Sequence, residues 1–196
     1  LGGKVLRLAR DRKAAPGNPS MPGFDSRAFA FGFRYPVSLT FHPNTEQLVV
    51  AEQGGEHPDE ITIVKPGGNS GWDPRCAGTA NAAYCGSTAS MTDLGRHPSA
   101  LLPAWRSQWS GERLSSAVWV RDPVWREWNN TLAVAFSRGK RVDLIKIDHL
   151  GQVQQQGTLL SQSCFGFRAI AQGPDGLYVV TEGKPGGEEI WQLLLR

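Results

Sequence analysis

Short apolar runs rich in valine, isoleucine, leucine and tryptophan alternate along the chain with turns of glycine, proline, asparagine and aspartate. Runs of about four to eight such residues between turn residues are typical of β-strands. The spacing of a long amphipathic helix is found almost nowhere. The pattern therefore predicts an all-β protein built from many short strands.

One order of features recurs along the chain. Residues 38–64 and 168–194 each contain a strand, a Pro-Asn or Pro-Asp turn, a second strand, a Gly-Gly loop and an acidic pair that opens a third strand. Residues 115–148 repeat this order more loosely, with Leu132–Phe136 and Val142–Ile147 as the second and third strands. Three copies of a short antiparallel unit predict the blades of a β-propeller. A β-sandwich with coincidental turns is the alternative, and it explains the shared order less well.

We expect these copies to be four-stranded antiparallel blades of one partial propeller domain that spans residues 1–196. About three blades are present, at about residues 29–72, 115–148 and 165–195, and residues 73–110 form a long irregular insertion. Three blades do not close a six-bladed ring, and they leave apolar sides open. A missing N-terminal half or a partner chain is therefore expected to complete the propeller.

Composition and charge place the chain among ordinary globular proteins. Hydrophobic residues make up 40% and charged residues 20%, which separates it from the disordered and membrane classes. No apolar run approaches the roughly 20 residues that cross a bilayer, so we expect no membrane span. The formal charge of +3 is too small to indicate a nucleic-acid partner.

The three cysteines leave two redox states open. Cys76 and Cys85 flank a short segment and could close a small disulfide loop, which would leave Cys164 free. Three reduced thiols explain the same sequence equally well. The cysteines do not form a metal-binding motif.

The most informative stretch is EQGGEHPDEITIVKPGGNSGW, at residues 52–72. A glycine turn follows a strand directly, carries the carboxylates of Asp59 and Glu60, and returns into another strand. Backbone carbonyl oxygens and carboxylates are the ligands that hard cations prefer. The turn therefore has the chemistry to hold a hard cation or a polyanionic cofactor, although its outline recurs at residues 182–189 as a general feature of the repeat.

Four segments together resemble the soluble quinoprotein glucose/sorbosone dehydrogenase family, which includes the aldose sugar dehydrogenases. They are GKVLRL (3–8), FAFGFRYPVSLTFHP (29–43), the stretch from VVAEQGG to GGNSGW (49–72), and FRAIAQGPDGLYVVTEG (167–183). These segments span most of the chain and follow the family order. The resemblance implies a six-bladed β-propeller, of which this chain is about the C-terminal half.

The resemblance also implies a cofactor, a metal and a reaction. Pyrroloquinoline quinone (PQQ) would lie over the central channel, held by basic side chains and a calcium ion. An aldose or other small polyol would lose hydride to the quinone while a histidine takes the hydroxyl proton. The family also implies an extracellular or periplasmic location. None of His42, His57, His97 and His149 matches the catalytic histidine, so no catalytic residue is assigned and this chain alone is expected to be inactive.

Position by position, the resemblance assigns cofactor contacts and metal ligands. Arg34 matches the cofactor-binding arginine of the family, and Tyr35 stands where the family has asparagine. Gln53 is expected to contact the cofactor and opens the calcium turn. The implied calcium ligands are Gly54, Gly55 and Asp59, with Gly55 standing where proline is frequent.

Three further cofactor contacts are matched more loosely. Trp109 falls near the position at which an aromatic ring stacks on the planar cofactor. Lys140 matches a cofactor-contacting lysine of the penultimate blade. Arg168 matches the second arginine of the family's Arg-x-Arg, and Gly166 stands where the first should be.

Each assignment has a structural alternative. Arg34 can instead form an ion pair with Asp59 or Glu60. The Gln53-Gly54 turn can be an ordinary connection between blade strands, and Lys140 can be solvated surface. A non-catalytic propeller used for binding, as in the hedgehog-interacting-protein-like relatives of the family, is therefore the alternative function. A structural subunit of a larger assembly is the third possibility.

Overall fold

The computed structural model describes residues 2–75, 89–161, 163–183 and 186–194 of the chain. These residues form thirteen short strands and one 3-10 helix, η1 (Pro123–Trp128). No helix among the described residues is long and apolar enough to cross a membrane. The prediction of an all-β protein is confirmed.

Four antiparallel sheets contain these strands, and strands that follow one another in the sequence are neighbours in each sheet. The first sheet contains β1 (Lys4–Leu6) and β2 (Ala28–Phe31). The second contains β3 (Pro36–Phe41), β4 (Leu48–Glu52), β5 (Pro58–Val64) and β6 (Trp105–Ser110). The third contains β7 (Leu114–Trp119), β8 (Leu132–Phe136), β9 (Arg141–Ile147) and β10 (Val153–Thr158). The fourth contains β11 (Gly166–Gly173), β12 (Gly176–Glu182) and β13 (Ile190–Leu193).

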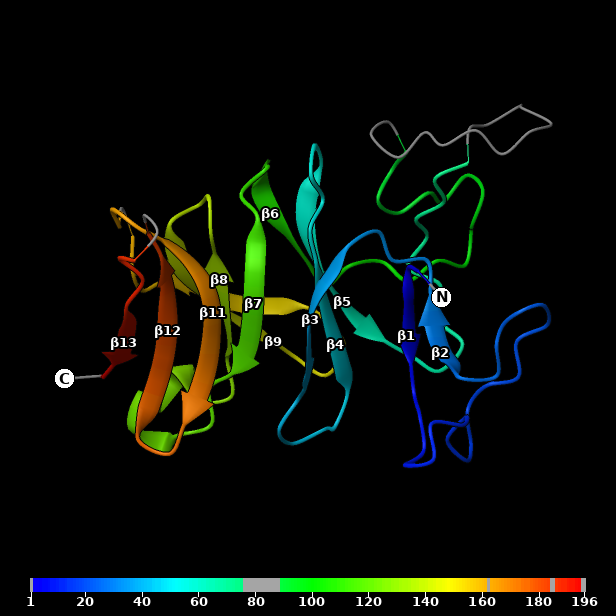
Figure 1. Ribbon diagram of the computed structural model, residues 1–196, viewed down its shortest axis with the longest axis horizontal. Coiled ribbons are helices and arrows are strands. Elements are labelled where there is room, and N and C mark those ends of the chain that lie inside the picture. Colours follow the sequence, from blue (N-terminus) through cyan, green and yellow to red (C-terminus); the bar gives the residue numbers. More distant parts are fainter. Residues whose placement is uncertain (1, 76–88, 162, 184–185, 195–196) are drawn as a thin grey trace.

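The sheets stand side by side, from the β1–β2 pair at one end of the molecule to β11–β13 at the other (Figure 1). The first strands of the three larger sheets form an inner row, in which β3 contacts β7 and β7 contacts β11. The remaining strands of each sheet follow outward from this row. This is the arrangement of blades around the axis of a β-propeller. We call β3–β6, β7–β10 and β11–β13 the first, second and third blade.

Each inner strand carries the same irregularity near its start. The pairing register with the second strand of the blade shifts by one residue at Val37, Ser115 and Arg168. Such β-bulges increase the local twist and redirect the bulged side chain. Their recurrence at one position shows that the three blades are copies of a single unit, even where their sequences differ.

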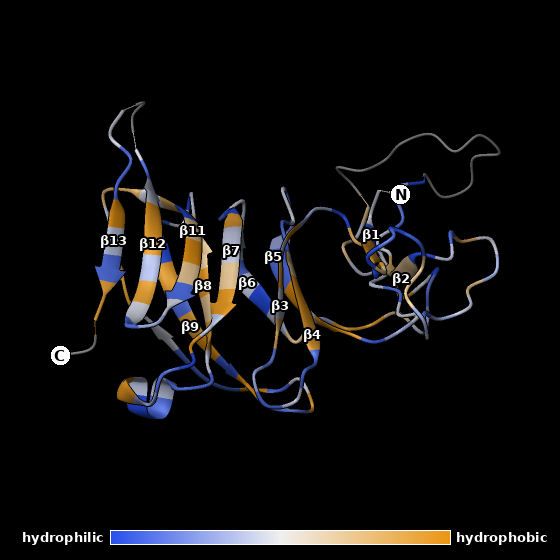
Figure 2. Cartoon of the chain, turned by 60° about the horizontal axis from the view of Figure 1, so that its bottom comes forward, coloured by the Kyte–Doolittle hydropathy of each residue, from blue (hydrophilic) through white to orange (hydrophobic). Residues whose placement is uncertain are grey.

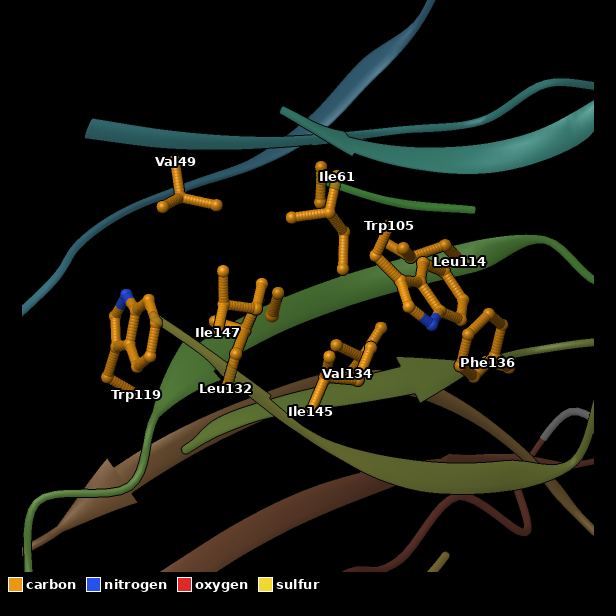
Figure 3. Packing of buried hydrophobic residues seen from close by; sticks show 12 residues of the cluster. Val49, Ile61, Trp105, Leu114, Trp119, Leu132, Val134, Phe136, Ile145 and Ile147 are labelled. Atoms are coloured by element: carbon orange, nitrogen blue, oxygen red, sulfur yellow. The ribbon is translucent and has the colours of Figure 1, made fainter. Parts of the chain in front are cut away.

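Apolar side chains fill the spaces between neighbouring blades. Between the first and second blades, Val49 and Ile61 of one sheet face Leu132, Val134 and Ile145 of the other (Figure 3). A second cluster joins the second and third blades, and a third lies between the β1–β2 pair and the first blade. The second strands β4 and β8 are buried along their whole length. Apolar residues thus concentrate in the strands and polar ones in the connections (Figure 2), so that packing between blades holds the structure together.

Two features of the sheets differ from the sequence prediction. β6 lies at the end of residues 73–110, the interval expected to be an irregular insertion, and it forms the fourth strand of the first blade. β2 pairs with β1 in a separate sheet rather than joining the blade expected at residues 29–72. The signal for β6 is weak because this edge strand buries only Trp105 and Ser107.

The cysteines lie in two parts of the chain. Cys164 is an exposed free thiol in the connection between the second and third blades. Cys76 and Cys85 fall outside the described residues, so their pairing stays a prediction from the sequence.

Candidate functional site

The residues that the sequence assigns to a cofactor or metal lie at one end of the blades. The inner strands β3, β7 and β11 start at this end, and antiparallel pairing returns the chain to it between the second and third strands. Arg34 and Tyr35 precede β3, residues 53–57 connect β4 to β5, and Lys140 lies in the turn from β8 to β9. This is the upper end in Figure 1. The repeating blade therefore gathers loops that are far apart in the sequence on one face.

Arg34 contacts the glycine turn of the first blade. Its guanidinium Nη1 donates a hydrogen bond to the Gly54 carbonyl oxygen. A Cβ atom at Gly55 would lie 3.1 to 3.3 Å from the guanidinium atoms, so the side chain of Arg34 lies directly against the bare backbone there. The structure thus brings Arg34, Gly54 and Gly55 together. Among the described residues, Arg34 does not form the alternative ion pair with Asp59 or Glu60. Glu60 pairs with Arg106 instead, at 2.8 Å.

Asp59 and Gln53 bind the neighbouring blade. The fully buried Asp59 carboxylate accepts hydrogen bonds from the Gly54 amide at 2.9 Å and from the Leu114 amide at 2.6 Å. Gln53 Nε2 donates to the Leu114 carbonyl oxygen at 2.8 Å. Burial raises the pKa of Asp59, although both amide hydrogen bonds act in the opposite direction. Both side chains therefore satisfy the backbone of Leu114, the first residue of β7, from the first blade.

A pair of buried carboxyl groups lies on the opposite face of the first blade. Glu52 and Glu60 occupy directly paired positions on β4 and β5, and both are almost fully buried. Glu52 accepts the Arg34 backbone amide at 2.8 Å and the Ser70 hydroxyl at 3.3 Å. Burial raises the pKa of Glu52 to about 7, and the negative charge of Glu60 adds to the shift. Burial raises the pKa of Glu60 as well, against the effect of Arg106.

The sequence analysis missed Glu52, although a signal was present. In the strand LVVAE, positions Leu48, Val50 and Glu52 alternate onto one face, and the first two of them are apolar. A carboxyl group at the third position of such a stripe is expected to be buried. On β5, Glu60 shares a face with Thr62 and Val64, of which only Val64 is apolar, so the signal for its burial is weaker.

A cavity of about 410 Å³ opens beside Glu60. Its lining includes His57, Met91, Thr92 and Arg106. The Thr92 hydroxyl donates to Glu60 at 3.4 Å, and His57 Nε2 is buried without a hydrogen-bond partner among the described residues. His57 is the histidine that the sequence places nearest to the turn, and it borders this cavity together with one ion pair.

The remaining predicted contacts share the upper end, and among the described residues none of their side chains forms a hydrogen bond with the Arg34 guanidinium. Tyr35 is exposed, as are Lys140 in its turn and Arg168 at the bulge of β11. Neither Lys140 nor Arg168 forms an ion pair with any described residue, and both present free positive charge to solvent. Trp109 ends the outermost strand of the first blade, where it is 64% exposed and borders a separate cavity of about 500 Å³ with Glu112 and Arg141. The four predicted contacts are therefore on one face but not in one contact cluster.

Gly166 leaves no space for the first arginine of the expected Arg-x-Arg. A Cβ atom at this position would lie 2.1 Å from the Ser137 carbonyl oxygen of the second blade. This separation is far below a normal contact distance, so the glycine allows the start of β11 to approach the turn after β8. The departure from the family pattern at Gly166 is thus part of the packing between the second and third blades.

The donor groups of the calcium turn do not fit a calcium ion in this arrangement. The Gly54 carbonyl oxygen accepts hydrogen bonds from both Arg34 and the His57 amide. Each oxygen of the Asp59 carboxylate accepts a backbone amide. Within the residues that the structure describes, no group of three or more histidine, cysteine, aspartate or glutamate side chains is placed to hold a metal. By contrast, exposed cations at Lys140 and Arg168 fit an anionic cofactor.

Antiparallel blades of three or four described strands stand around an axis, with polar and charged loops collected at one end. They define this protein as part of a β-propeller with a candidate binding face. The incomplete ring is consistent with a six-bladed parent fold. The family model for glucose/sorbosone dehydrogenase matches residues 1–195, and the chain belongs to that family. The resemblance drawn from the sequence is confirmed.

Individual relatives agree with this assignment. Quinoprotein glucose dehydrogenase B of Acinetobacter calcoaceticus is 45% identical over 76 residues, which are 39% of this chain and 16% of that protein. Aldose sugar dehydrogenase YliI of Escherichia coli strain K12 is 24% identical over 189 residues, covering 95% of this chain and 50% of the relative. The structure of the PQQ-bound form of aldose sugar dehydrogenase from Streptomyces coelicolor has a TM-score of 0.69 at 23% identity, covering 96% of this chain and 51% of that one. The chain spans about half the length of the aldose sugar dehydrogenases that it matches.

Proposed function

We propose that the protein is a quinoprotein sugar dehydrogenase, which in its full-length form oxidises an aldose by hydride transfer to PQQ. Membership of the glucose/sorbosone dehydrogenase family supports a sugar dehydrogenase-like propeller. The observation that carries the cofactor is the pair of exposed cations, Lys140 and Arg168, at the same end of neighbouring blades. PQQ is a planar polyanion, and unpaired cations on one face provide the charge-assisted hydrogen bonds that such a molecule needs.

The residues of this chain have distinct parts in the proposed site. When bound, PQQ supplies the electron sink of the reaction. Lys140 and Arg168 hold its carboxylates from the second and third blades. Tyr35 offers a ring and a hydroxyl where the family has an amide, and Arg34 adds positive charge at the same end of the first blade. No histidine of this chain is assigned as the base, and calcium has no step because two of its three expected donors, Gly54 and Asp59, already accept hydrogen bonds.

The proposal is tested by titrating quinone into a full-length protein that contains this chain, with tryptophan fluorescence as the readout of binding. Lys140→Ala and Arg168→Ala are each expected to weaken binding about tenfold, because each removes one charged contact. Lys65→Ala is the matched control, since Lys65 is exposed at the opposite end of the first blade. The dehydrogenase proposal is lost if micromolar quinone does not bind and the two variants behave like the control.

The 196-residue chain alone is expected to show no quinone-linked oxidation of an aldose. It provides about half of the length of its relatives and no assigned base. The measurement is a dye-linked assay of the purified chain with added quinone and aldose. Turnover above the rate of the quinone without protein contradicts this expectation.

A second candidate function is a non-catalytic propeller that binds a partner or a polyol. Gly166 favours it, because the packing against Ser137 excludes an arginine there. The replacement of asparagine by Tyr35 favours it as well. A full-length protein that binds an aldose or polyol but neither binds nor reduces the quinone would establish this function in place of the first.

The remaining parts of the proposal concern partner and place. Leu39 and Phe41 on β3 are each 56% exposed, and Ile190 at the other end of the row of blades is 72% exposed. Exposed apolar residues at both ends of the row, beside the β1–β2 pair and on the third blade, support completion of the ring by an N-terminal half or a partner chain. An extracellular or periplasmic location follows the family, and cell fractionation with an antibody to this chain tests it.

A further inference from the structure

We infer that Arg34 supplies the positive charge at the Gly54 carbonyl oxygen, and that the loop of residues 53–59 holds its shape without calcium, as a clamp between the first and second blades. The inference rests on the geometry of this loop and holds whether or not the protein binds a quinone. It concerns Arg34 as a positioning residue for the loop.

The Gly54 carbonyl oxygen has no free lone pair directed at a metal. It accepts the Arg34 guanidinium and, at 3.1 Å, the backbone amide of His57. A carbonyl oxygen has two lone pairs, and two donors use both of them. A calcium ion would have to displace the guanidinium, and the two positive charges repel each other.

Each oxygen of the Asp59 carboxylate also has a backbone partner. Its two oxygens accept the amides of Gly54 and Leu114, and its own amide donates to the Ser107 hydroxyl at 2.8 Å. Asp59 is fully buried, and its carboxylate is therefore held by backbone amides rather than by a metal. Calcium needs about six to eight oxygen ligands. Of the three expected ligands, only the Gly55 carbonyl oxygen accepts no hydrogen bond from the described residues, and one such oxygen is far short of that number.

The clamp joins two blades through a single residue. Leu114 donates its amide to Asp59 and accepts the Gln53 side chain on its carbonyl oxygen at 2.8 Å. Both backbone groups of this buried residue are thus satisfied by the loop of the first blade. Loss of the loop geometry would leave two buried polar groups without partners.

The glycine at position 55 explains how Arg34 reaches the loop. Gly55 has a φ of 64°, a conformation that proline cannot adopt because its ring fixes φ near −65°. The guanidinium lies where a Cβ atom at Gly55 would make contacts as short as 3.1 Å. A side chain at position 55 would crowd the guanidinium, so the glycine provides the space in which Arg34 lies. The two features are therefore parts of one arrangement.

The test compares Arg34→Ala, Arg34→Lys and the matched control Arg138→Ala, which removes an exposed arginine of the same face. Thermal unfolding is followed with EDTA and with millimolar calcium, and amide hydrogen exchange is read at Gly54 and Leu114. The wild type is expected to show the same Tm in both buffers and no heat on calcium titration. Arg34→Ala is expected to speed exchange at both amides about tenfold in EDTA, because a charged hydrogen bond is lost. Arg34→Lys keeps the charge and should restore part of the protection, and the control should match the wild type.

Two results overturn the inference. One is submillimolar calcium binding that raises the Tm of the wild type and is lost in Asp59→Asn. The other is wild-type exchange at Gly54 and Leu114 in a folded Arg34→Ala protein. If Arg34→Ala does not fold, the calcium titration of the wild type and the exchange in Arg34→Lys still decide. Neither measurement uses quinone. A result that overturns this inference is therefore distinguishable from one that overturns the proposed dehydrogenase function.

Discussion

At the scale of single residues, Glu52 links the buried side of β4 to the main chain of Arg34. Its carboxyl accepts the Arg34 amide at 2.8 Å and faces Glu60 across the strand pair. Glu52 and Glu60 are buried side by side, and Arg106 pairs with Glu60. The neutral form of Glu52 is therefore favoured. Its protonation state therefore affects the stability of the loop that carries the candidate site.

We predict that Glu52→Gln flattens the pH dependence of stability. The pKa of Glu52 is raised from 4.5 to about 7, so the folded state binds this proton more tightly than the unfolded chain does. The stability that protonated Glu52 contributes is fully present below about pH 4.5. It is lost as the pH rises through about 7, and the loss in the free energy of unfolding reaches about 3 kcal/mol. Glutamine keeps the acceptor for Arg34, so the variant should be more stable than the wild type above pH 7. Urea unfolding at pH 5 and pH 8 measures this, and parallel pH profiles of the two proteins would refute it.

Gly166 is the second residue whose identity follows from packing. We predict that Gly166→Ala lowers the free energy of unfolding by about 1–3 kcal/mol, because its Cβ atom would overlap the Ser137 carbonyl. Arginine at the same position should cost more, so restoring the family residue is not expected to restore a site. Gly2→Ala is the control, since nothing lies within 4 Å of a Cβ atom there. Equal stability of the two alanine variants in urea would show that β11 moves freely away from Ser137.

The sequence could predict which residues of the turn meet, but not what they bind. Arg34, Gln53, Gly54 and Asp59 are close together as the family motif implies. Their observed partners are largely backbone groups, above all the amide and carbonyl of Leu114, about sixty residues away. Backbone groups carry no residue-specific signal, so this role of Gln53 and Asp59 becomes visible only when the blades are placed side by side. The assigned cofactor roles of these residues stay predictions.

At the scale of elements, side chains of one blade close the edge of the next inner strand. The Ser38 hydroxyl lies 3.1 Å from both the carbonyl oxygen and the amide nitrogen of Ala117 on β7. Ser115 lies 2.5 Å from the Phe167 carbonyl oxygen, and Ser116 lies 3.4 Å from that of Ile170 on β11. Small hydroxyl side chains on the inner strands therefore occupy the positions at which a paired strand would otherwise be needed.

We predict that Ser38→Ala destabilises the protein by about 1–3 kcal/mol. The change leaves the amide and carbonyl of the buried Ala117 without their shared partner. Ser99→Ala, at an exposed position, should change the free energy of unfolding by less than about 0.5 kcal/mol. Urea unfolding compares the two variants. A Ser38→Ala protein as stable as Ser99→Ala would mean that water replaces the hydroxyl.

The strands that the sequence predicted well are those with buried, apolar patterns. β8 coincides with the predicted Leu132–Phe136, and β9 begins one residue earlier than predicted. The outer strands β6 and β10 were missed because their side chains face solvent, as in the polar run Gln154–Gln156 of β10. Edge strands depend on pairing with a neighbour and carry little pattern of their own.

At the scale of the whole molecule, the third blade ends the row with an open side, and the β1–β2 pair covers the outer side of the first blade only in part. β3 exposes Leu39 and Phe41 on one side, and the third blade exposes Ile190 and Leu194 on the other. The third blade has three strands in the described residues, whereas the first and second have four. An open strand edge with exposed apolar residues favours association with another chain.

We predict that the purified chain self-associates as its concentration rises. Ile190→Lys combined with Leu194→Lys should reduce this association, because both residues are largely exposed on the open side of the third blade. Leu150→Lys is the matched control, since Leu150 is 72% exposed in the turn between β9 and β10. Size exclusion with light scattering gives the mass of each protein. A compact wild-type monomer at high concentration would contradict the prediction and the half-propeller model.

Several side-chain hydrogen bonds along the inner row run from an earlier blade to a later one, although the Arg121 guanidinium binds the Phe41 carbonyl oxygen of β3 in the opposite direction. At Leu114 and Ala117 of β7 and at Phe167 and Ile170 of β11, the side chains that bind the strand come from the blade earlier in the sequence. A ribosome releases the earlier blade first, so each inner strand leaves the exit tunnel towards partners that are already in place. Synthesis from the N-terminus thus runs in the same direction as these contacts to Leu114, Ala117, Phe167 and Ile170.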